Sequence, residues 1–250
     1  MKIFAIGRRA LCALLAALTL SISMTACDTD RGDEEETVDN QAYLLLANKQ
    51  QVLGASYTPD ELTTLDPDLT VGGKTIQLEA TAAKAVEQLI AAIRAAGYKD
   101  IAVTSGYRTY AYQQTLFDRY MAQERAKPAN ADKSDREIEA IVMTYSAKPG
   151  TSEHQTGLCV DLFDTRQMLE LENYGYEGQY PDDVGFAETK AYAWLKSNAH
   201  RYGFILRYPE NKVDITGYQY ESWHYRYVGV EAATEIWEKG LTLEEYLENS

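Results

Sequence analysis

An apolar run that carries a single carboxylate constrains the fold of this chain more than any other feature. Residues 158–163 are all apolar except Asp161. A short run of this composition predicts a buried strand. Burial of a carboxylate costs free energy unless it is hydrogen-bonded, paired with a charge or bound to a metal. The sequence therefore predicts that Asp161 has partners inside a folded domain, either backbone donors or a metal ion.

The rest of the pattern mixes helices with short strands. Apolar residues recur at helical spacing over residues 82–93, and Gly97 follows as a stop signal. Ser134 and Glu137 form a capping-box pattern that begins another helix. Further helices are predicted at 112–125, at 189–200 and from 242, and strands at 101–104, 204–207 and 223–228. Because these elements do not alternate regularly, we expect an α+β fold with a small, mainly antiparallel sheet and flanking helices.

The first forty residues are predicted to lie outside this fold. Positive charges precede a short apolar run at residues 10–20, a pattern typical of a secretory signal rather than of a transmembrane helix. Residues 24–27, Met-Thr-Ala-Cys, resemble a bacterial lipobox, which implies cleavage of residues 1–26 as a lipoprotein signal peptide and lipidation of Cys27. Residues 27–40 carry seven acidic residues and one arginine, so we expect an acidic flexible linker.

Residues 41–250 are then expected to form one domain, held outside the cytoplasm on the outer face of the bacterial cytoplasmic membrane. An ordinary signal peptide with an incidental Cys27 is the alternative. Of three cysteines, only Cys159 lies within the domain, so no intramolecular disulfide is expected there. The net charge of −14 makes nucleic acid an unfavourable partner. Nothing in the sequence indicates an obligate dimer, and a monomer is expected.

Two of the three histidines lie near acids in the sequence. His154 precedes Asp161 by seven residues, and His224 follows Glu221 by three. A catalytic zinc site needs about three protein ligands from histidine and carboxylate, with a position left open for water. His154, Asp161 and His224 satisfy that count. Glu221 then remains available as a general base. Taken singly, the cluster around His154 and the cluster around His224 are each weak evidence for a zinc site. His200 falls at a predicted helix end, where the helix dipole favours a histidine, and is not expected to bind metal.

At this point a family resemblance becomes specific. The motifs S-x-H-x-x-G-x-x-x-D at residues 152–161 and E-x-W-H at 221–224 resemble those of the zinc D-alanyl-D-alanine carboxypeptidases of the VanY type. The wider group includes lysostaphin-like peptidases and the hedgehog signalling domain. Asn48-Lys49, Ser105-Gly106-Tyr107-Arg108 with Gln113, and Tyr202-Gly203-Phe204 also match in order. The resemblance covers residues 43–230 and implies a hedgehog/D-Ala-D-Ala peptidase-like zinc fold. This chain differs from the family pattern at Cys159, where the family usually has Ala. We interpret the Cys159 side chain as part of the packed core.

The resemblance also implies roles by position. One Zn²⁺ per chain is held by His154, Asp161 and His224, and Glu221 takes a proton from water as a general base. Arg108 holds the terminal carboxylate of the substrate or the developing oxyanion. The other expected substrate contacts are Gln113, Ser105, Ser152 and Trp223. Because Glu221 and His224 would face opposite sides of a flat strand, we expect a bend, a bulge or a strand end between them.

The leading functional hypothesis is a D,D-carboxypeptidase that removes the terminal D-Ala from peptidoglycan stem pentapeptides. An L,D-carboxypeptidase acting on tetrapeptides is the closest rival, because both substrates end in a D-residue with a free carboxylate. A non-catalytic cell-wall-binding lipoprotein with the same fold is a second class, against which the retention of Glu221 and Arg108 argues. A solute-binding lipoprotein is a third, and it predicts two lobes and no metal.

Overall fold

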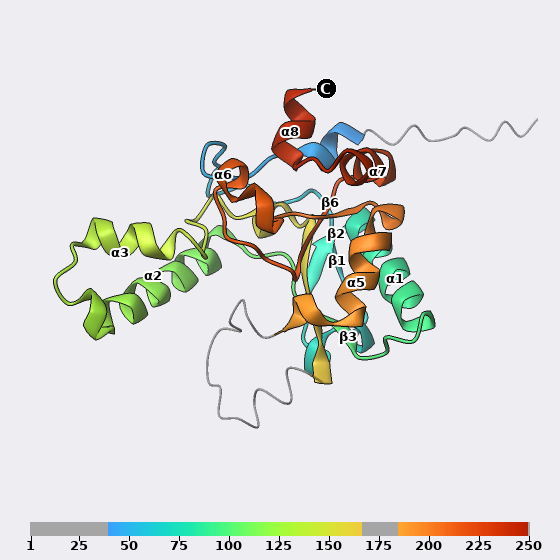
Figure 1. Cartoon of the computed structure of the whole chain (residues 1–250), viewed down its shortest axis with the longest axis horizontal. Coiled ribbons are helices and arrows are strands. Elements are labelled where there is room, and N and C mark those ends of the chain that lie inside the picture. The colour runs from blue at the N-terminus through green and yellow to red at the C-terminus, as the bar shows by residue number, and fades with distance from the viewer. Residues whose placement is uncertain (1–39, 167–184, 250) are drawn as a thin grey trace, which may run out of the picture. The chain divides into compact units, whose positions relative to one another are not determined.

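The computed structural model describes residues 40–166 and 185–249 (Figure 1). Its helices are α1 (Ala80–Ala95), α2 (Tyr110–Ala126), α3 (Asp135–Val142), α5 (Lys190–Asn198), α6 (Val213–Thr216), α7 (Val230–Lys239) and α8 (Leu243–Glu248). Its strands are β1 (Leu62–Thr64), β2 (Gln77–Glu79), β3 (Ile101–Ser105), β4 (Cys159–Asp164), β5 (Phe204–Leu206) and β6 (His224–Tyr227). The predicted signal segment and Cys27 lie outside the described residues. Within the described ranges, no helix has both the length and the apolar character that a membrane span requires.

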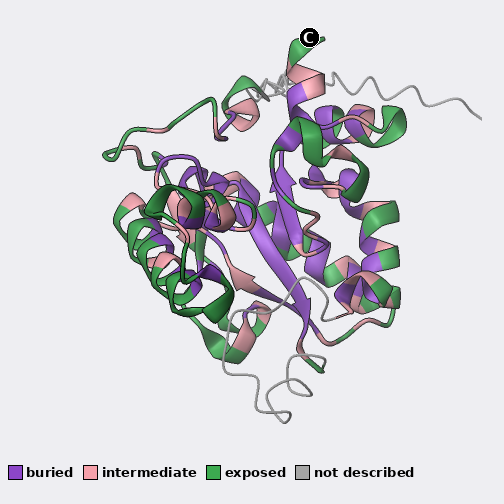
Figure 2. Ribbon diagram, turned by 60° about the vertical axis from the view of Figure 1, so that its left-hand side comes forward, coloured by how far each residue is buried: buried purple, intermediate pink, exposed green. Residues whose placement is uncertain are grey.

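A four-stranded antiparallel sheet forms the centre of the fold. Its strand order is β3-β4-β6-β5, so β4 lies inside the sheet with a partner on each side. Strands β1 and β2 form a separate two-stranded antiparallel ribbon. The central strands are buried along their length, whereas the outer faces of the helices are exposed (Figure 2). The expected α+β class with a small antiparallel sheet is confirmed.

The two faces of the central sheet have different neighbours. Val160 and Leu162 of β4 belong to the main hydrophobic core, together with the buried face of α1 and residues of α5. Because side chains alternate along a strand, Cys159 and Asp161 point to the opposite face. All six residues of β4 are buried, so this second face is covered as well. Asp161 is thus held on a rigid central strand, as its apolar flanks predict.

Helices α2 and α3 lie side by side and project from the sheet (Figure 1). They enclose a small apolar cluster of their own, Phe117, Tyr120 and Val142. Helix α3 begins with the predicted capping box, in which the side chains of Ser134 and Glu137 each bond the backbone of the other. Helices α2 and α3 therefore form a packed helical pair rather than a loop. This pair forms one wall of the cleft described below.

Three parts of the fold are absent from the sequence-based prediction: the β1–β2 ribbon, the four-residue helix α6 and helix α7. The ribbon strands β1 and β2 have three residues each, too few for an alternating pattern to be recognised. Helix α7 follows directly on β6 and packs through Ala232, Ala233 and Ile236. Its Trp237 is half exposed. The predicted elements are all present, and their ends differ from the prediction by at most three residues.

Candidate metal centre and substrate cleft

Three segments distant in sequence deliver the candidate ligands. His154 lies in a 3₁₀ turn, Glu153–Thr156, and Asp161 lies in β4, directly opposite His224 at the start of β6. Gly157 ends the turn at φ +68°. A Cβ there would stand 2.9 Å from the backbone nitrogen of Glu79, so the tight return into β4 requires glycine.

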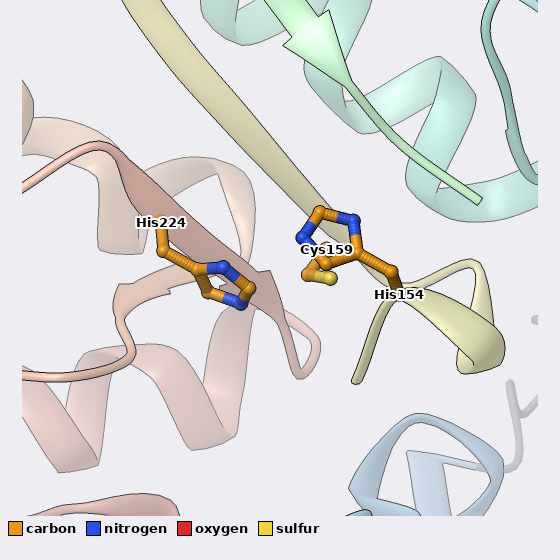
Figure 3. A group of neighbouring side chains, drawn as sticks. All are labelled: His154, Cys159 and His224. Carbon is orange, nitrogen blue, oxygen red and sulfur yellow. The ribbon is translucent and has the colours of Figure 1, made fainter. Parts of the chain in front are cut away.

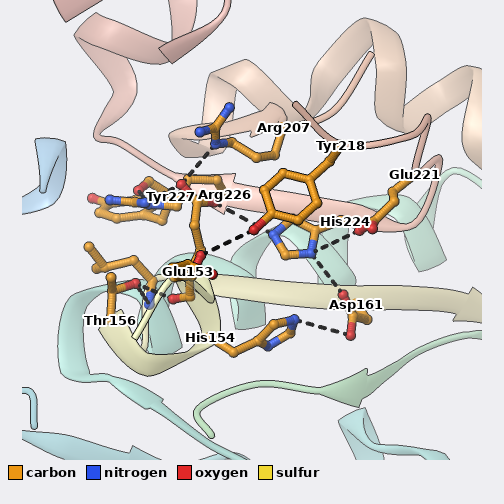
Figure 4. Close-up of polar contacts among 12 residues, drawn as sticks. Glu153, His154, Thr156, Asp161, Arg207, Tyr218, Glu221, His224, Arg226 and Tyr227 are labelled. Atoms are coloured by element: carbon orange, nitrogen blue, oxygen red, sulfur yellow. Dashed lines mark hydrogen bonds and ion pairs between the residues drawn. The ribbon is translucent and has the colours of Figure 1, made fainter. Parts of the chain in front are cut away.

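The Asp161 carboxylate lies between the two imidazoles (Figure 4). Its Oδ2 is 3.4 Å from His154 Nε2, and its Oδ1 is 3.2 Å from His224 Nδ1. Oδ1 is buried and makes no hydrogen bond to any described residue. A buried oxygen left without a hydrogen bond is costly in the absence of a further partner. The donor set, two imidazole nitrogens and one carboxylate, fits a zinc ion with an open coordination position.

The outer nitrogens of the two imidazoles face protein acceptors. His154 Nδ1 lies 2.6 Å from the carbonyl oxygen of Gly106, so Nδ1 carries the hydrogen and the lone pair of Nε2 faces Asp161. His224 Nε2 faces the carboxylate of Glu153 at 3.6 Å, which directs Nδ1 toward Asp161. The surrounding protein therefore presents one ring nitrogen of each histidine to the same point.

Glu221 reaches the same point through a strand end. The backbone N–H of His224 donates to the Glu221 carbonyl over 3.3 Å and closes a turn just before β6. Glu221 Oε2 consequently lies 3.5 Å from His224 Nδ1. The break in the strand expected between these two residues is present.

Cys159 also lies at this cluster. Its Sγ and one ring nitrogen each of His154 and His224 lie within 4.8 Å of one another (Figure 3). Thiolate is an accepted zinc ligand, so the trio is an alternative ligand set. Asp161 contacts both rings at 3.2 and 3.4 Å and lines the open cleft, whereas Cys159 is 0 % exposed. We therefore retain Asp161 as the third ligand in our proposal. The interpretation of Cys159 as core packing was incomplete, because strand alternation turns it toward the imidazoles.

Burial and opposite charges shift the pKa values of this cluster. Burial and Arg108 lower the pKa of His154, but Cys159 and Asp161 outweigh them and raise it to about 9. Burial alone raises the pKa of Asp161, whereas the two imidazoles and Arg108 bring it well below its usual range. Burial also raises the pKa of the Cys159 thiol, but His154 and His224 lower it to about 7. Without metal, the Cys159 thiolate and an ionised Asp161 therefore both stabilise a protonated His154.

We expect the metal-free protein to lose stability as pH rises from 6.5 to about 9. The folded pKa of His154 is about 9 against an ordinary value of 6.5, so its protonation stabilises the fold fully below pH 6.5. This contribution, roughly 1–3 kcal/mol, disappears as pH rises through 9. Cys159, whose pKa is lowered to about 7, acts in the opposite direction over this range, but the pKa of His224 is raised well above its usual value and its deprotonation offsets the effect of the thiol. Urea denaturation of chelator-treated protein across this range measures it. Zinc-loaded protein is the control and should not lose stability in this way, because zinc binds the deprotonated ring. A flat profile for the metal-free form would contradict the assignment.

A cavity of about 650 Å³ opens over the cluster. Its floor includes His154, Asp161, Glu221 and His224. One wall comes from the face of α2 that carries Tyr112, Gln113, Leu116, Arg119, Tyr120 and Gln123. The volume lies in the range of pockets that bind small molecules and short peptide ends. The ligands thus have solvent access from one side, as a catalytic rather than a purely structural metal site requires.

Arg108 stands between this cavity and the cluster. Its Nη2 contacts Asp161 Oδ2 at 2.9 Å, and its Nε donates to Ser105 Oγ at 2.9 Å. Its side chain is 22 % exposed and lines the cavity. Arg108 thus pairs with Asp161 and also faces the space for substrate. The Ser105 hydroxyl thus helps to fix the Arg108 side chain.

The other expected substrate contacts also line the cavity. Gln113 Nε2 donates to the carbonyl of Ala147, and Ser152 is buried at the cavity edge. Trp223 stacks on Phe163 with ring centroids 5.7 Å apart, so it serves both the wall and the core. His200 lies elsewhere, stacked on Trp237 at 4.1 Å, away from this cavity.

Three buried charged residues beside the cluster were missed by the sequence analysis: Glu153, Arg207 and Arg226. All three side chains are 0 % exposed. The sequence did contain one signal: an arginine lies next to or within a strand that is predicted to be buried. A buried charge needs a partner, so such an arginine indicates a buried acid nearby. That signal did not indicate which acid the partner would be.

An open cleft over a buried His-Asp-His cluster, on a small antiparallel sheet, is the arrangement expected of a zinc enzyme with one candidate metal site. A family model described as VanY, D-alanyl-D-alanine carboxypeptidase, matches residues 75–230 and so includes every candidate site residue named above. The chain belongs to the VanY D-alanyl-D-alanine carboxypeptidase family.

Relatives and solved structures agree with this membership. The putative carboxypeptidase YodJ of Bacillus subtilis is 37% identical over 224 residues, which cover 88% of this chain and 73% of the relative. The LdcB LD-carboxypeptidase structure matches with a TM-score of 0.64 and 36% identity, over 84% of this chain and 88% of that one. A vancomycin resistance D,D-pentapeptidase, VanY, solved in complex with Zn(II), matches with a TM-score of 0.62 and 37% identity, over 82% and 99%. The expected fold and family are confirmed.

Proposed function

We propose that this chain is a zinc-dependent D,D-carboxypeptidase that removes the C-terminal D-Ala from peptidoglycan stem peptides. The observation that carries the proposal is the convergence of His154, Asp161 and His224 beneath a cleft that also exposes Arg108. Family membership and the Zn(II) complex of a structural neighbour support it. The described residues fall within one compact unit, which supports a single catalytic domain.

The residues divide the chemistry between them. His154 Nε2, Asp161 and His224 Nδ1 would hold the ion. When bound, zinc supplies a Lewis acid and lowers the pKa of a coordinated water toward about 7. Glu221 accepts the proton of the water that attacks the scissile carbonyl and returns it to the leaving amine. Its place at the strand end, 3.5 Å from His224 Nδ1, suits this transfer.

Arg108 provides the preference for a free chain end. A guanidinium has five N–H donors in a planar fork, and the contacts to Ser105 and Asp161 engage two of its nitrogens. The side of the group that faces the cavity can meet the terminal carboxylate of the substrate. Binding there positions the last peptide bond over the candidate ligands.

Arg108→Lys is expected to lower kcat/KM by about 10- to 1000-fold, because lysine lacks the planar fork. A stem peptide with a C-terminal amide tests the role directly. The wild type should prefer the free acid strongly, and the variant should lose most of that preference. Arg119→Gln, in the same cavity wall, is the matched control and should keep the preference. An unchanged preference in Arg108→Lys would contradict the assignment.

An L,D-carboxypeptidase is the second candidate, favoured by the match to the LdcB LD-carboxypeptidase structure. Purified protein incubated with defined penta- and tetrapeptides, followed by mass spectrometry, separates the two candidates. Release of D-Ala from the pentapeptide alone supports D,D specificity, and release from the tetrapeptide alone supports the rival. Stoichiometric zinc without cleavage of either peptide would favour the non-catalytic wall-binding alternative, and absence of zinc would favour the solute-binding one.

We also propose that the protein is a monomer anchored outside the cytoplasm through a lipid on Cys27. The acidic linker and the lipobox-like residues 24–27 support this location. Metabolic labelling with palmitate should mark the wild type but not Cys27→Ser. An unlabelled wild type in a bacterial host would contradict the anchor, and a sedimentation measurement tests the monomer.

A further inference from the structure

A fully buried carboxylate lies behind the metal-binding face of His224. Glu153 is the first residue of the 3₁₀ turn, and its side chain is 0 % exposed. Its Oε1 accepts hydrogen bonds from Arg207 Nε and Arg226 Nη1, both at 2.8 Å. Its other oxygen, Oε2, points at His224 Nε2 over 3.6 Å (Figure 4). One carboxylate therefore links two buried arginines to a candidate ligand.

The two facing atoms have no other hydrogen bond. Glu153 Oε2 and His224 Nε2 are both buried, and neither bonds to any described residue. At 3.6 Å their separation is slightly longer than a hydrogen bond. A small movement of the ring closes it and satisfies both atoms at once. Each therefore has the other as its natural partner.

The arginines fix the carboxylate in place. Arg207 forms a two-pronged pair with Glu244 of α8, at 2.6 and 2.8 Å. Arg226 Nη2 donates to the carbonyls of Tyr43 and Leu45, at 2.9 and 2.7 Å. Segments from both ends of the domain thus hold the two guanidinium groups, and these groups determine where Glu153 lies.

The same contacts surround the Glu153 carboxylate with positive charge. Arg207 and Arg226 each form an ion pair with Oε1 at 2.8 Å, so two positive charges lie beside the carboxylate. An ionised carboxylate can only accept hydrogen bonds. The group opposite Oε2 must therefore be a donor, which selects the form of His224 with hydrogen on Nε2. In that form the lone pair of Nδ1 faces Asp161.

We infer that Glu153 is a positioning residue of the metal centre: it holds the His224 ring so that Nδ1 is presented to the ion. The inference rests on the proposed zinc function. Partners of this kind, which bond the outer nitrogen of a ligand histidine, typically change metal affinity by about 10- to 100-fold. Glu153 does not touch substrate, and its effect passes through His224.

Glu153→Gln is the decisive variant. The two arginine donors require an oxygen, so the amide orients its oxygen toward them and its NH₂ toward His224. This arrangement favours the wrong ring form, with hydrogen on Nδ1. We expect the dissociation constant for zinc, measured by chelator competition, to rise by about 10- to 100-fold. We also expect the visible absorption spectrum of the Co²⁺-substituted protein to change.

Glu244→Gln is the matched control. It removes a carboxylate from the same buried arginine cluster but does not contact His224. It should lower stability but change zinc affinity and the cobalt spectrum far less than Glu153→Gln does, because it reaches His224 only through Arg207 and Glu153. If Glu153→Gln weakens zinc binding no more than Glu244→Gln does, Glu153 is merely structural and the inference fails.

Two further outcomes remain distinguishable. If Glu153→Gln does not fold, Glu153→Asp keeps the charge but shortens the reach to Nε2. It should also weaken zinc binding, and unchanged affinity would overturn the inference. If the wild type itself binds no zinc, the proposed function fails, whereas zinc bound equally by wild type and variants rejects only the role of Glu153.

Discussion

Glu221→Gln should lower turnover of a stem peptide by about 100- to 10 000-fold, the usual contribution of a general base. The amide keeps the shape of the side chain but cannot accept the proton of the attacking water. His154, Asp161 and His224 are untouched, so zinc should remain bound at one ion per chain. Steady-state kinetics together with elemental analysis measures both effects.

The control for this substitution is Glu231→Gln, an exposed acid on α7 that does not line the cleft. It should retain both zinc and activity. Peptide cleavage by Glu221→Gln at the wild-type rate would refute the assigned base. Loss of zinc from this variant would instead make Glu221 a ligand or a support for one.

Asp161→Asn is expected to have the second large effect. The variant replaces the carboxylate that contacts both imidazoles and Arg108, so zinc affinity should fall by at least about 100-fold and activity with it. An amide oxygen carries no charge to offset that of the ion. Chelator competition and the metal content of the purified protein provide the measurement.

Cys159→Ala separates the two possible ligand sets. If Asp161 is the third ligand, this variant should bind zinc as the wild type does, because the thiol only packs beside the rings. If the ion is instead held by His154, Cys159 and His224, Cys159→Ala should weaken zinc binding more than Asp161→Asn does. Such a reversal would require the proposed ligand set to be replaced.

Much of the fold follows from short-range patterns. The apolar spacing of α1, the capping box of α3 and the apolar run of β4 each depend on a few neighbouring residues, and each is present. The three-residue strands β1 and β2 carry too little pattern, because their pairing depends on contacts with each other. Long, strongly patterned elements are therefore predictable, and short elements held by tertiary pairing are not.

The candidate site divides in the same way. Residue types and their order along the chain sufficed to name His154, Asp161, Glu221 and His224, because zinc chemistry demands those groups and the motifs match a family. Which ring nitrogen faces the ion, and which acid orients His224, depends on side chains from separate segments. The pairing of Arg108 with Asp161 and the place of Cys159 beside the rings depend on strand register and on the turn at Gly157. Distances of this kind arise only when β4, β6 and the 3₁₀ turn pack together, since periodicity along one segment contains no information about its neighbours.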